Sequence, residues 1–155
     1  MTNNDVLRSL QQVLGVNEAT LTDIFKLSRH PIEQSTVASF LKDASDTAYA
    51  ECNDNVLTLF LDGLITYRRG TSPQNPPDTR KIFPPLTNNS IFKKLRIAFD
   101  LKEEDLLELM SLANYEVSKN ELSAIFRKPG HKHYRSCSDD FLMGFLVGLT
   151  YRQWK

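Results

Sequence analysis

Apolar residues along this chain recur three and four positions apart, which is the spacing of amphipathic α-helices. The first such stretch can be capped by Thr2 or Asn3 and stops at Gly15. Its apolar positions are Val6, Leu7, Leu10, Val13 and Leu14. The pattern predicts a helix there and a second helix soon afterwards, whose apolar positions are Leu21, Ile24, Phe25 and Leu27.

Two further helices are predicted in each half of the chain. In the second half, Ser118 and Glu121 form a capping box at the start of the third helix. The fourth helix is capped by Asn53 in the first half and by Ser138 in the second. Its apolar positions in the first half are Val56, Leu57, Leu59, Phe60, Leu61, Leu64 and Ile65. Because they cover more than one face, we expect this helix at the centre of its bundle.

The whole pattern occurs twice, because a shift of 85 positions aligns Met1–Arg69 with Leu86–Trp154 without a gap. The triplet Thr-Asn-Asn opens both copies. The matched positions that we single out are Tyr49, Cys52, Asp54 and Gly63 in the first copy, which recur as Tyr134, Cys137, Asp139 and Gly148. The sequence therefore predicts an all-α fold made by tandem duplication of a four-helix unit.

Prolines mark the connection between the two copies. Five of the seven prolines fall within residues 71–85, where they remove backbone donors and disfavour a helix. We therefore predict repeat 1 over residues 1–70, a proline-rich linker over 71–85 and repeat 2 over 86–155.

Three sequence features resemble a known family. They are the opening Thr-Asn-Asn-Asp-Val-Leu-Arg-Ser-Leu, the repeated Cys-x-Asp block and the Phe-Leu-Asp-Gly-Leu of residues 60–64. Together they resemble the YehS-like family of uncharacterised bacterial proteins, over nearly the whole chain. The resemblance implies a bacterial cytosolic protein with two tandem helical domains, and it implies no activity or catalytic residues.

The charge of the chain is balanced as a whole but not between its halves. The 19 basic and 19 acidic residues cancel, so the net charge favours neither a polyanion nor a membrane surface as partner. Residues 1–70 hold six basic and nine acidic residues, a net charge of −3, whereas residues 86–155 hold eleven and nine, a net charge of +2. An anionic partner is therefore expected to prefer repeat 2.

The chain carries no signal for secretion or membrane insertion. Its first residues lack a basic segment followed by an apolar run, and no apolar stretch approaches the roughly eighteen residues of a membrane span. Two cysteines are too few for a disulfide framework. We therefore expect a cytoplasmic protein whose cysteines are thiols.

The basic residues of repeat 2 gather near its third helix. They are Lys119, Arg127, Lys128, Lys132 and Arg135, a strip that could contact phosphates or remain a solvated face.

The second and third helices of each half also resemble a helix-turn-helix. Val117, Leu122 and Ile125 have the apolar spacing of that motif's turn and recognition helix. The connection is longer than the usual tight turn and has no glycine. Nucleic-acid binding is thus one hypothesis for repeat 2.

A zinc site is a weaker hypothesis. His131, His133 and Cys137 are of the residue types that bind zinc. The first copy has Asp46 and Ala48 in place of the two histidines, and no fourth ligand lies nearby. We therefore expect no cofactor.

The matched positions of the two repeats have structural explanations. Cys52 and Cys137 precede apolar helices, where a thiol packs as a small hydrophobic group. Asp54 and Asp139 suit the first turn of a helix. The tyrosines are either partner anchors or packed rings.

The helical glycines predict close packing. Gly63 and Gly148 are expected to let a neighbouring helix approach the backbone. Gly144 and Gly148 form a Gly-x-x-x-Gly spacing that we interpret in the same way.

No enzyme motif stands out, since the chain has no phosphate-binding glycine loop, nucleophile elbow or His-Glu-x-x-His helix. We favour a non-enzymatic protein-interaction or regulatory module with a protein partner. Two alternatives stay open. One is nucleic-acid binding by the basic strip, and the other is an enzyme or a small-molecule or metal site near His131 and Cys137.

Overall fold

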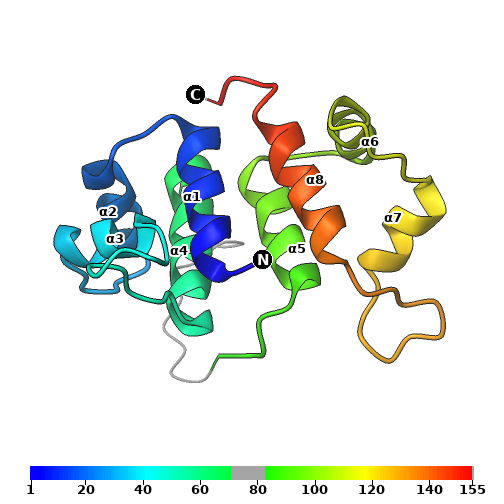
Figure 1. Cartoon of the computed structure of the whole chain (residues 1–155). Helices are drawn as coiled ribbons and strands as arrows, with labels where there is room; N and C mark the ends of the chain where they lie inside the picture. Colours follow the sequence, from blue (N-terminus) through cyan, green and yellow to red (C-terminus); the bar gives the residue numbers. More distant parts are fainter. Residues whose placement is uncertain (71–82, 155) are drawn as a thin grey trace.

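The computed structural model describes residues 1–70 and 83–154, and within these ranges it contains eight helices and no strands. Repeat 1 comprises α1 (Asn3–Leu14), α2 (Glu18–Leu27), α3 (Gln34–Leu41) and α4 (Asp54–Arg69). Repeat 2 comprises α5 (Asn88–Ala98), α6 (Glu103–Leu112), α7 (Lys119–Ile125) and α8 (Asp139–Leu149) (Figure 1). The all-α prediction with four helices in each repeat is confirmed. Residues 71–82 of the predicted linker lie outside the described residues.

Local capping signals set most helix boundaries. Thr2 caps α1 in a capping box with Asp5, and Gly15 ends this helix in the left-handed region at φ 64°. Asn53 and Ser138 cap α4 and α8 as predicted.

The start of α7 differs in part from the prediction. Ser118 accepts a bond from the backbone N–H of Glu121, as expected. The reciprocal bond of a capping box is absent among the described residues, because the Glu121 carboxylate pairs instead with Arg135, at 3.6 Å. The capping box predicted at Ser118 is therefore present only in its first half, the bond accepted by Ser118.

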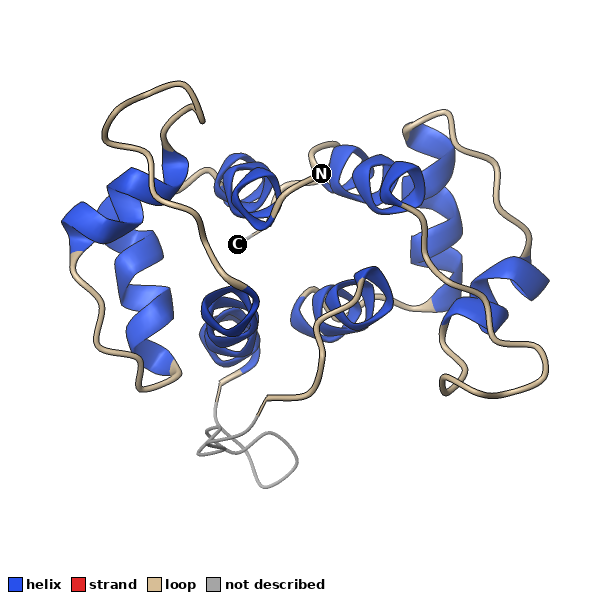
Figure 2. Cartoon of the chain, turned by 60° about the horizontal axis from the view of Figure 1, so that its bottom comes forward, coloured by secondary structure: helices blue, strands red, loops and turns tan. Residues whose placement is uncertain are grey.

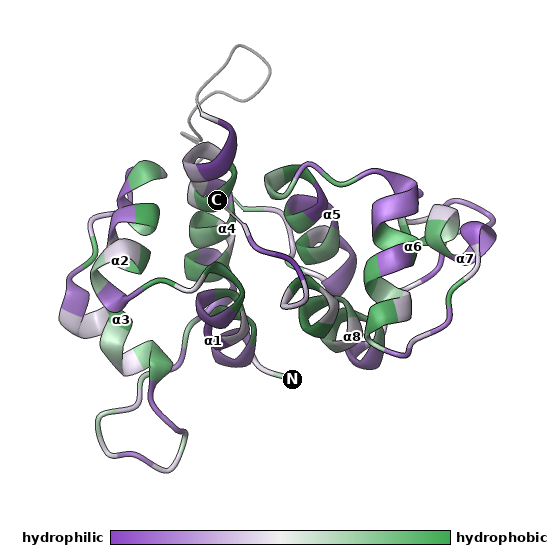
Figure 3. Ribbon diagram, turned by 90° about the horizontal axis from the view of Figure 1, so that it is seen from above, coloured by the Kyte–Doolittle hydropathy of each residue, from purple (hydrophilic) through white to green (hydrophobic). Residues whose placement is uncertain are grey.

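The two repeats meet through four central helices. Helix α4 packs on α5, and α1 packs on α8. Figure 2 views these four helices nearly end-on, with the remaining helices on the outside. Because α5 and α8 are the equivalents of α1 and α4, the interface has an approximate twofold symmetry. A single hydrophobic core runs through both repeats. Figure 3 shows hydrophobic residues on the central helices and also on outer helices such as α2 and α6.

Two glycines allow the central helices to approach their neighbours. A Cβ atom at Gly63 would overlap the carbonyl oxygen of Ile24, and one at Gly148 would overlap that of Leu109. Gly144 lies against the ring of Tyr115, where a Cβ atom would come within 3.3 Å. The prediction that these glycines serve close packing is confirmed.

The two sides of the interface between the repeats differ in how tightly they pack. On the α4–α5 side, Asp62 pairs with Lys94, and Arg68 donates to the carbonyl oxygen of Ala98 at 3.0 Å. On the α1–α8 side, the Met1 amino group pairs with Asp139 at 3.3 Å. Thr58 of α4 is buried, whereas its equivalent in α8, Met143, is 38% exposed. The α4–α5 side therefore forms the tighter half of the interface.

None of the helices in the described ranges is both long enough and apolar enough to cross a membrane.

Candidate functional site

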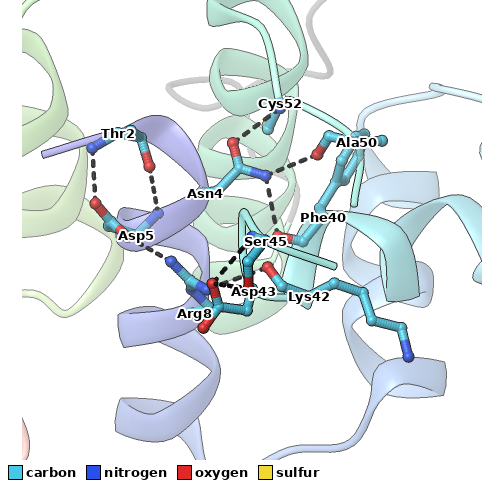
Figure 4. Close-up of polar contacts among 10 residues, drawn as sticks. All are labelled: Thr2, Asn4, Asp5, Arg8, Phe40, Lys42, Asp43, Ser45, Ala50 and Cys52. Atoms are coloured by element: carbon cyan, nitrogen blue, oxygen red, sulfur yellow. Dashed lines mark hydrogen bonds and ion pairs between the residues drawn. The ribbon is translucent and has the colours of Figure 1, made fainter. Parts of the chain in front are cut away.

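The duplicated Thr-Asn-Asn and Cys-x-Asp motifs hold one another in each repeat. The side-chain amide of Asn4 donates to the carbonyl oxygens of Phe40 and Ala50, at 3.0 and 2.8 Å. Its oxygen accepts a bond from the backbone N–H of Cys52, at 3.0 Å (Figure 4). Asn89 makes the equivalent three bonds in repeat 2. These asparagines therefore fix the loop that precedes the fourth helix of each repeat.

The aspartates of the Cys-x-Asp motif take part in the same arrangement. Asn3 donates to Asp54 at 2.8 Å, and Asn88 donates to Asp139 at 2.7 Å. Each aspartate also lies in the first turn of its helix, as predicted. Hydrogen bonding by Asn88 and the nearby terminal amino group lower the pKa of Asp139. Asp54 and Asp139 therefore do more than stabilise a helix terminus, because each also joins the two motifs of its repeat.

Neither cysteine is suited to act as a nucleophile. Burial, and to a lesser extent the neighbouring Asp54 or Asp139, raises the pKa of Cys52 and of Cys137 to about 12. The reactive form of cysteine is the thiolate, which such an environment disfavours.

The residues of the zinc hypothesis do not converge. The rings of His131 and His133 are 5.8 Å apart and exposed, whereas Cys137 is buried. Across residues 1–70 and 83–154, no three histidine, cysteine or acidic side chains are placed to hold a metal ion.

The five residues of the predicted basic strip do not form one continuous row. Lys119 is the first residue of α7, whereas Arg127 and Lys128 follow its end, and a helix of this length extends about 10 Å. Arg135 is paired with Glu121. The exposed face of α7 also includes Asn120 and Ser123, so it does not form a basic row. Nucleic-acid binding by these residues stays a prediction.

A surface hollow of about 510 Å³, here called hollow A, lies where α7 ends beside the start of α5. Its lining is mainly apolar, and the residues that form this part are Pro84, Pro85, Ile125, Phe126, Pro129 and Tyr134. Three cations, Lys93, Arg127 and Lys128, also line it. Over the described part of the chain, the side chains of Lys93 and Lys128 make no ion pair. Hollow A therefore combines an apolar wall with unpaired positive charge.

In repeat 1, the charges at the positions equivalent to hollow A cancel. The counterparts of Ser90, Lys93, Arg127 and Lys128 are Asp5, Arg8, Lys42 and Asp43. Arg8 pairs with Asp5 and donates to the carbonyl oxygen of Lys42 at 3.1 Å (Figure 4). The formal charge of the four positions is zero in repeat 1 and +3 in repeat 2. The two repeats share a fold but differ in what this surface attracts.

The pKa values of the two repeat 1 aspartates are lowered. The backbone N–H of Thr2 and, to a lesser degree, Arg8 lower the pKa of Asp5, although partial burial opposes them. Hydrogen bonds from Ser45 lower the pKa of Asp43. Both groups are therefore negatively charged at neutral pH, where they balance Arg8 and Lys42.

Lys93 is the cation of hollow A that the sequence analysis missed. It belongs to α5 and lies far from Arg127 in the sequence, so inspection of the basic strip did not find it. Pro84 and Pro85 were assigned to the linker. A comparison of charges at equivalent positions of the two repeats would have revealed the difference, because Asp5 and Asp43 become Ser90 and Lys128.

Comparisons with known proteins agree with the duplication. The family model described as "Protein of unknown function (DUF1456)" matches residues 3–70 and again residues 88–153. The chain is 38% identical over 156 residues to "Uncharacterized protein YehS" of Escherichia coli (strain K12), which covers 99% of this chain and 97% of the relative. No solved structure matches the chain. The resemblance to the YehS-like family is confirmed.

Proposed function

This chain belongs to the DUF1456 family of proteins of unknown function, and we propose that it is a non-enzymatic interaction module whose hollow A binds an acidic segment of a partner protein. The observation that carries this proposal is the formal charge of +3 at four positions of hollow A in repeat 2, where the equivalent four positions of repeat 1 sum to zero. We also propose that the protein acts in the cytosol, where both thiols would stay reduced.

The composition of hollow A supports binding of a protein segment. An apolar wall can take up an apolar side chain, and such anchors in pockets contribute most of the affinity of many interfaces. The cations around it would pair with carboxylates and speed association with an acidic partner. Phe126 and Tyr134 offer aromatic surface for the anchor.

The lining also favours binding over catalysis. Among the described residues that line hollow A there is no carboxylate, imidazole or thiol to serve as a general base or nucleophile. The Ser90 hydroxyl is engaged at the start of α5, where it donates to the backbone oxygen of Thr87 at 2.8 Å.

The test is binding of a fluorescein-labelled peptide, Glu-Glu-Phe-Glu, measured by anisotropy. The double substitution Lys93→Glu/Lys128→Glu should weaken binding by about tenfold or more, because each lost surface pair and its replacement by repulsion adds to the loss. The same peptide with Gln in place of Glu should bind weakly to both proteins.

The matched control is the pair Arg127→Glu and Lys42→Glu, which reverse charge at equivalent positions of the two repeats. Arg127→Glu should weaken binding, and Lys42→Glu should leave it unchanged. Equal losses in the two variants, or no binding of the acidic peptide to the wild type, would overturn the proposal.

Nucleic-acid binding is the second candidate, supported by the same three cations. If they contacted three phosphates of a single strand, the logarithm of the affinity would fall with the logarithm of salt concentration with a slope of about −2. Heparin and oligonucleotide titrations across a salt series, beside an Arg127→Glu/Lys128→Glu variant, measure that slope.

A further inference from the structure

A second hollow adjoins hollow A along the side of α7. This hollow, here called hollow B, has a volume of about 630 Å³. Its lining runs from Asn120 in the first turn of α7, past Ser123, to His133 in the following loop. Arg127 and Tyr134 line both hollows. The two hollows are therefore neighbours that share a wall, and a single ligand can contact both.

Hollow B differs from hollow A in charge. Its acidic residue, Glu121, pairs with Arg135 at 3.6 Å, so these two residues cancel. A third, smaller hollow, which Ser123 and Arg127 also line, contains both a cation, Arg96, and an acid, Glu103. The charged residues of the lining therefore sum to +3 in hollow A and to +1 in each of the other two hollows.

Outside hollow A this charge distribution is less suited to a polyanion than it is within hollow A. A nucleic-acid strand carries a phosphate on every nucleotide and gains affinity from each cation that it meets. Both hollows that share Arg127 with hollow A place a carboxylate, Glu103 or Glu121, beside a strand that continues into them. A peptide has no such constraint, because its charged and neutral residues can follow one another in any order.

Hollow B offers hydrogen-bonding groups to a neutral chain. The side chains of Asn120, Ser123 and His133 are exposed, and none of them makes a hydrogen bond to another described residue. Amide, hydroxyl and imidazole groups can pair with a peptide backbone or with small polar side chains.

Resting on the function proposed above, we infer that the bound partner is an extended peptide with two distinct parts. An acidic part with an aromatic or aliphatic anchor occupies hollow A, and a neutral polar part crosses Arg127 and occupies hollow B. Helix α7 is about 10 Å long at 1.5 Å per residue, and an extended chain advances about 3.3 Å per residue, so about three residues follow the anchor along hollow B.

The experiment compares three fluorescein-labelled probes on the full chain. The short peptide is Glu-Glu-Phe-Glu, the long peptide is Glu-Glu-Phe-Glu-Ser-Gln-Ser-Gly, and the third probe is an oligothymidylate of about twelve nucleotides, which is within the site size of single-strand binding domains. The long peptide should bind about tenfold more tightly than the short one, because it adds hydrogen bonds in hollow B. The oligothymidylate should bind more weakly than either.

Two variants test whether the higher affinity of the long peptide arises in hollow B. Asn120→Trp fills hollow B from an exposed position and should reduce the affinity of the long peptide to that of the short one, which itself should not change. Glu121→Gln removes the acid and frees Arg135, so it should strengthen oligothymidylate binding without strengthening the peptide contact in hollow A. Backbone amide shifts in NMR spectra should show the long peptide at both hollows and the short peptide at hollow A.

The outcomes separate the two proposals. If the short peptide binds at hollow A and the long peptide binds no better, the inference about hollow B is wrong and the proposed function stands. If neither peptide binds, the proposed function fails first. Tighter binding of the oligothymidylate, with a steep loss in salt, would overturn the inference in favour of a nucleic-acid strand.

Discussion

Arg8 in repeat 1 lies between Asp5 and the carbonyl oxygen of Lys42, whereas its equivalent in repeat 2, Lys93, has Ser90 in place of the aspartate. Lys128 likewise replaces Asp43. The surrounding motifs, with their asparagine bonds and central helices, are the same in both repeats. A duplicated fold can therefore keep its scaffold intact while its two copies carry different charge at one equivalent surface.

The shared scaffold gives the largest expected effect. Gly63→Ala and Gly148→Ala each place a Cβ atom against a backbone carbonyl, which only a shift of a whole helix can relieve. We expect each to lower the free energy of unfolding by about 3 kcal/mol, near the upper end of the usual cost of overpacking. Urea unfolding measures this loss.

Gly144→Ala is the control for both glycines. Its new Cβ would meet the Tyr115 ring at 3.3 Å, and a side chain can yield where a backbone carbonyl cannot. Its cost should be partly offset by the roughly 1 kcal/mol that alanine gains over glycine in a helix. A loss at Gly144 as large as that at Gly148 would contradict the close-packing explanation.

Removal of the hydrogen bonds made by Asn4 or Asn89 should have the next largest effect on the free energy of unfolding. Asn4→Ala removes three hydrogen bonds and leaves buried backbone groups without partners, and we expect a loss of about 2–3 kcal/mol. Asn89→Ala should cost less, because Asn89 is only partly buried whereas Asn4 is fully buried. Equal losses on urea unfolding would show that exposure to water does not distinguish the two repeats here.

Converting the charges of repeat 2 to those of repeat 1 should abolish the difference in binding. Ser90→Asp/Lys128→Asp gives hollow A a formal charge of zero, and aspartate at position 90 suits the capping box because Asp5 occupies that place in α1. Affinity for the acidic peptide should fall about tenfold, or about 1.4 kcal/mol, with little change in stability. Retained affinity would mean that the charge difference does not govern binding.

The smallest expected effect is on the loss of stability at acid pH, through the ionisation of Asp5. The folded-state pKa of Asp5 lies below its ordinary value, so this group stabilises the protein above the unfolded-state pKa, and the contribution is lost as the pH falls below about 4. Asp5→Ser should make stability less dependent on pH in this range, as measured by urea midpoints at about pH 5 and pH 3. Ser90→Asp should increase that dependence, and no difference between the variants would contradict the assignment.

Local signals accounted for the elements of the fold. The Thr2 cap, the Gly15 stop and the Ser138 cap act within one turn of their helices, so sequence neighbours suffice to predict them. The capping box at Ser118 failed in part because Arg135, from a later loop, competes for Glu121. A distant cation does not always have this effect, because Asp105 pairs with Arg152 and still accepts the backbone N–H of Lys102 at the start of α6.

The candidate site was predicted in part. Arg127 and Lys128 were identified from their positions in the sequence, and they do line hollow A. Lys119 was grouped with them although it starts α7 and they follow its end. Lys93 was missed because it comes from another helix. Sequence proximity therefore grouped cations that the fold separates and separated cations that the fold joins.

The sequence by itself determined the duplication, the helices and the need for close approach at Gly63 and Gly148, because periodicity, caps and missing side chains act over short distances along the chain. Only the tertiary structure decided which charges are neutralised and which are free. Electrostatic attraction depends on separation in space and on exposure to water. The packing of α5 beside the end of α7 therefore decided that Lys93, Arg127 and Lys128 line one hollow.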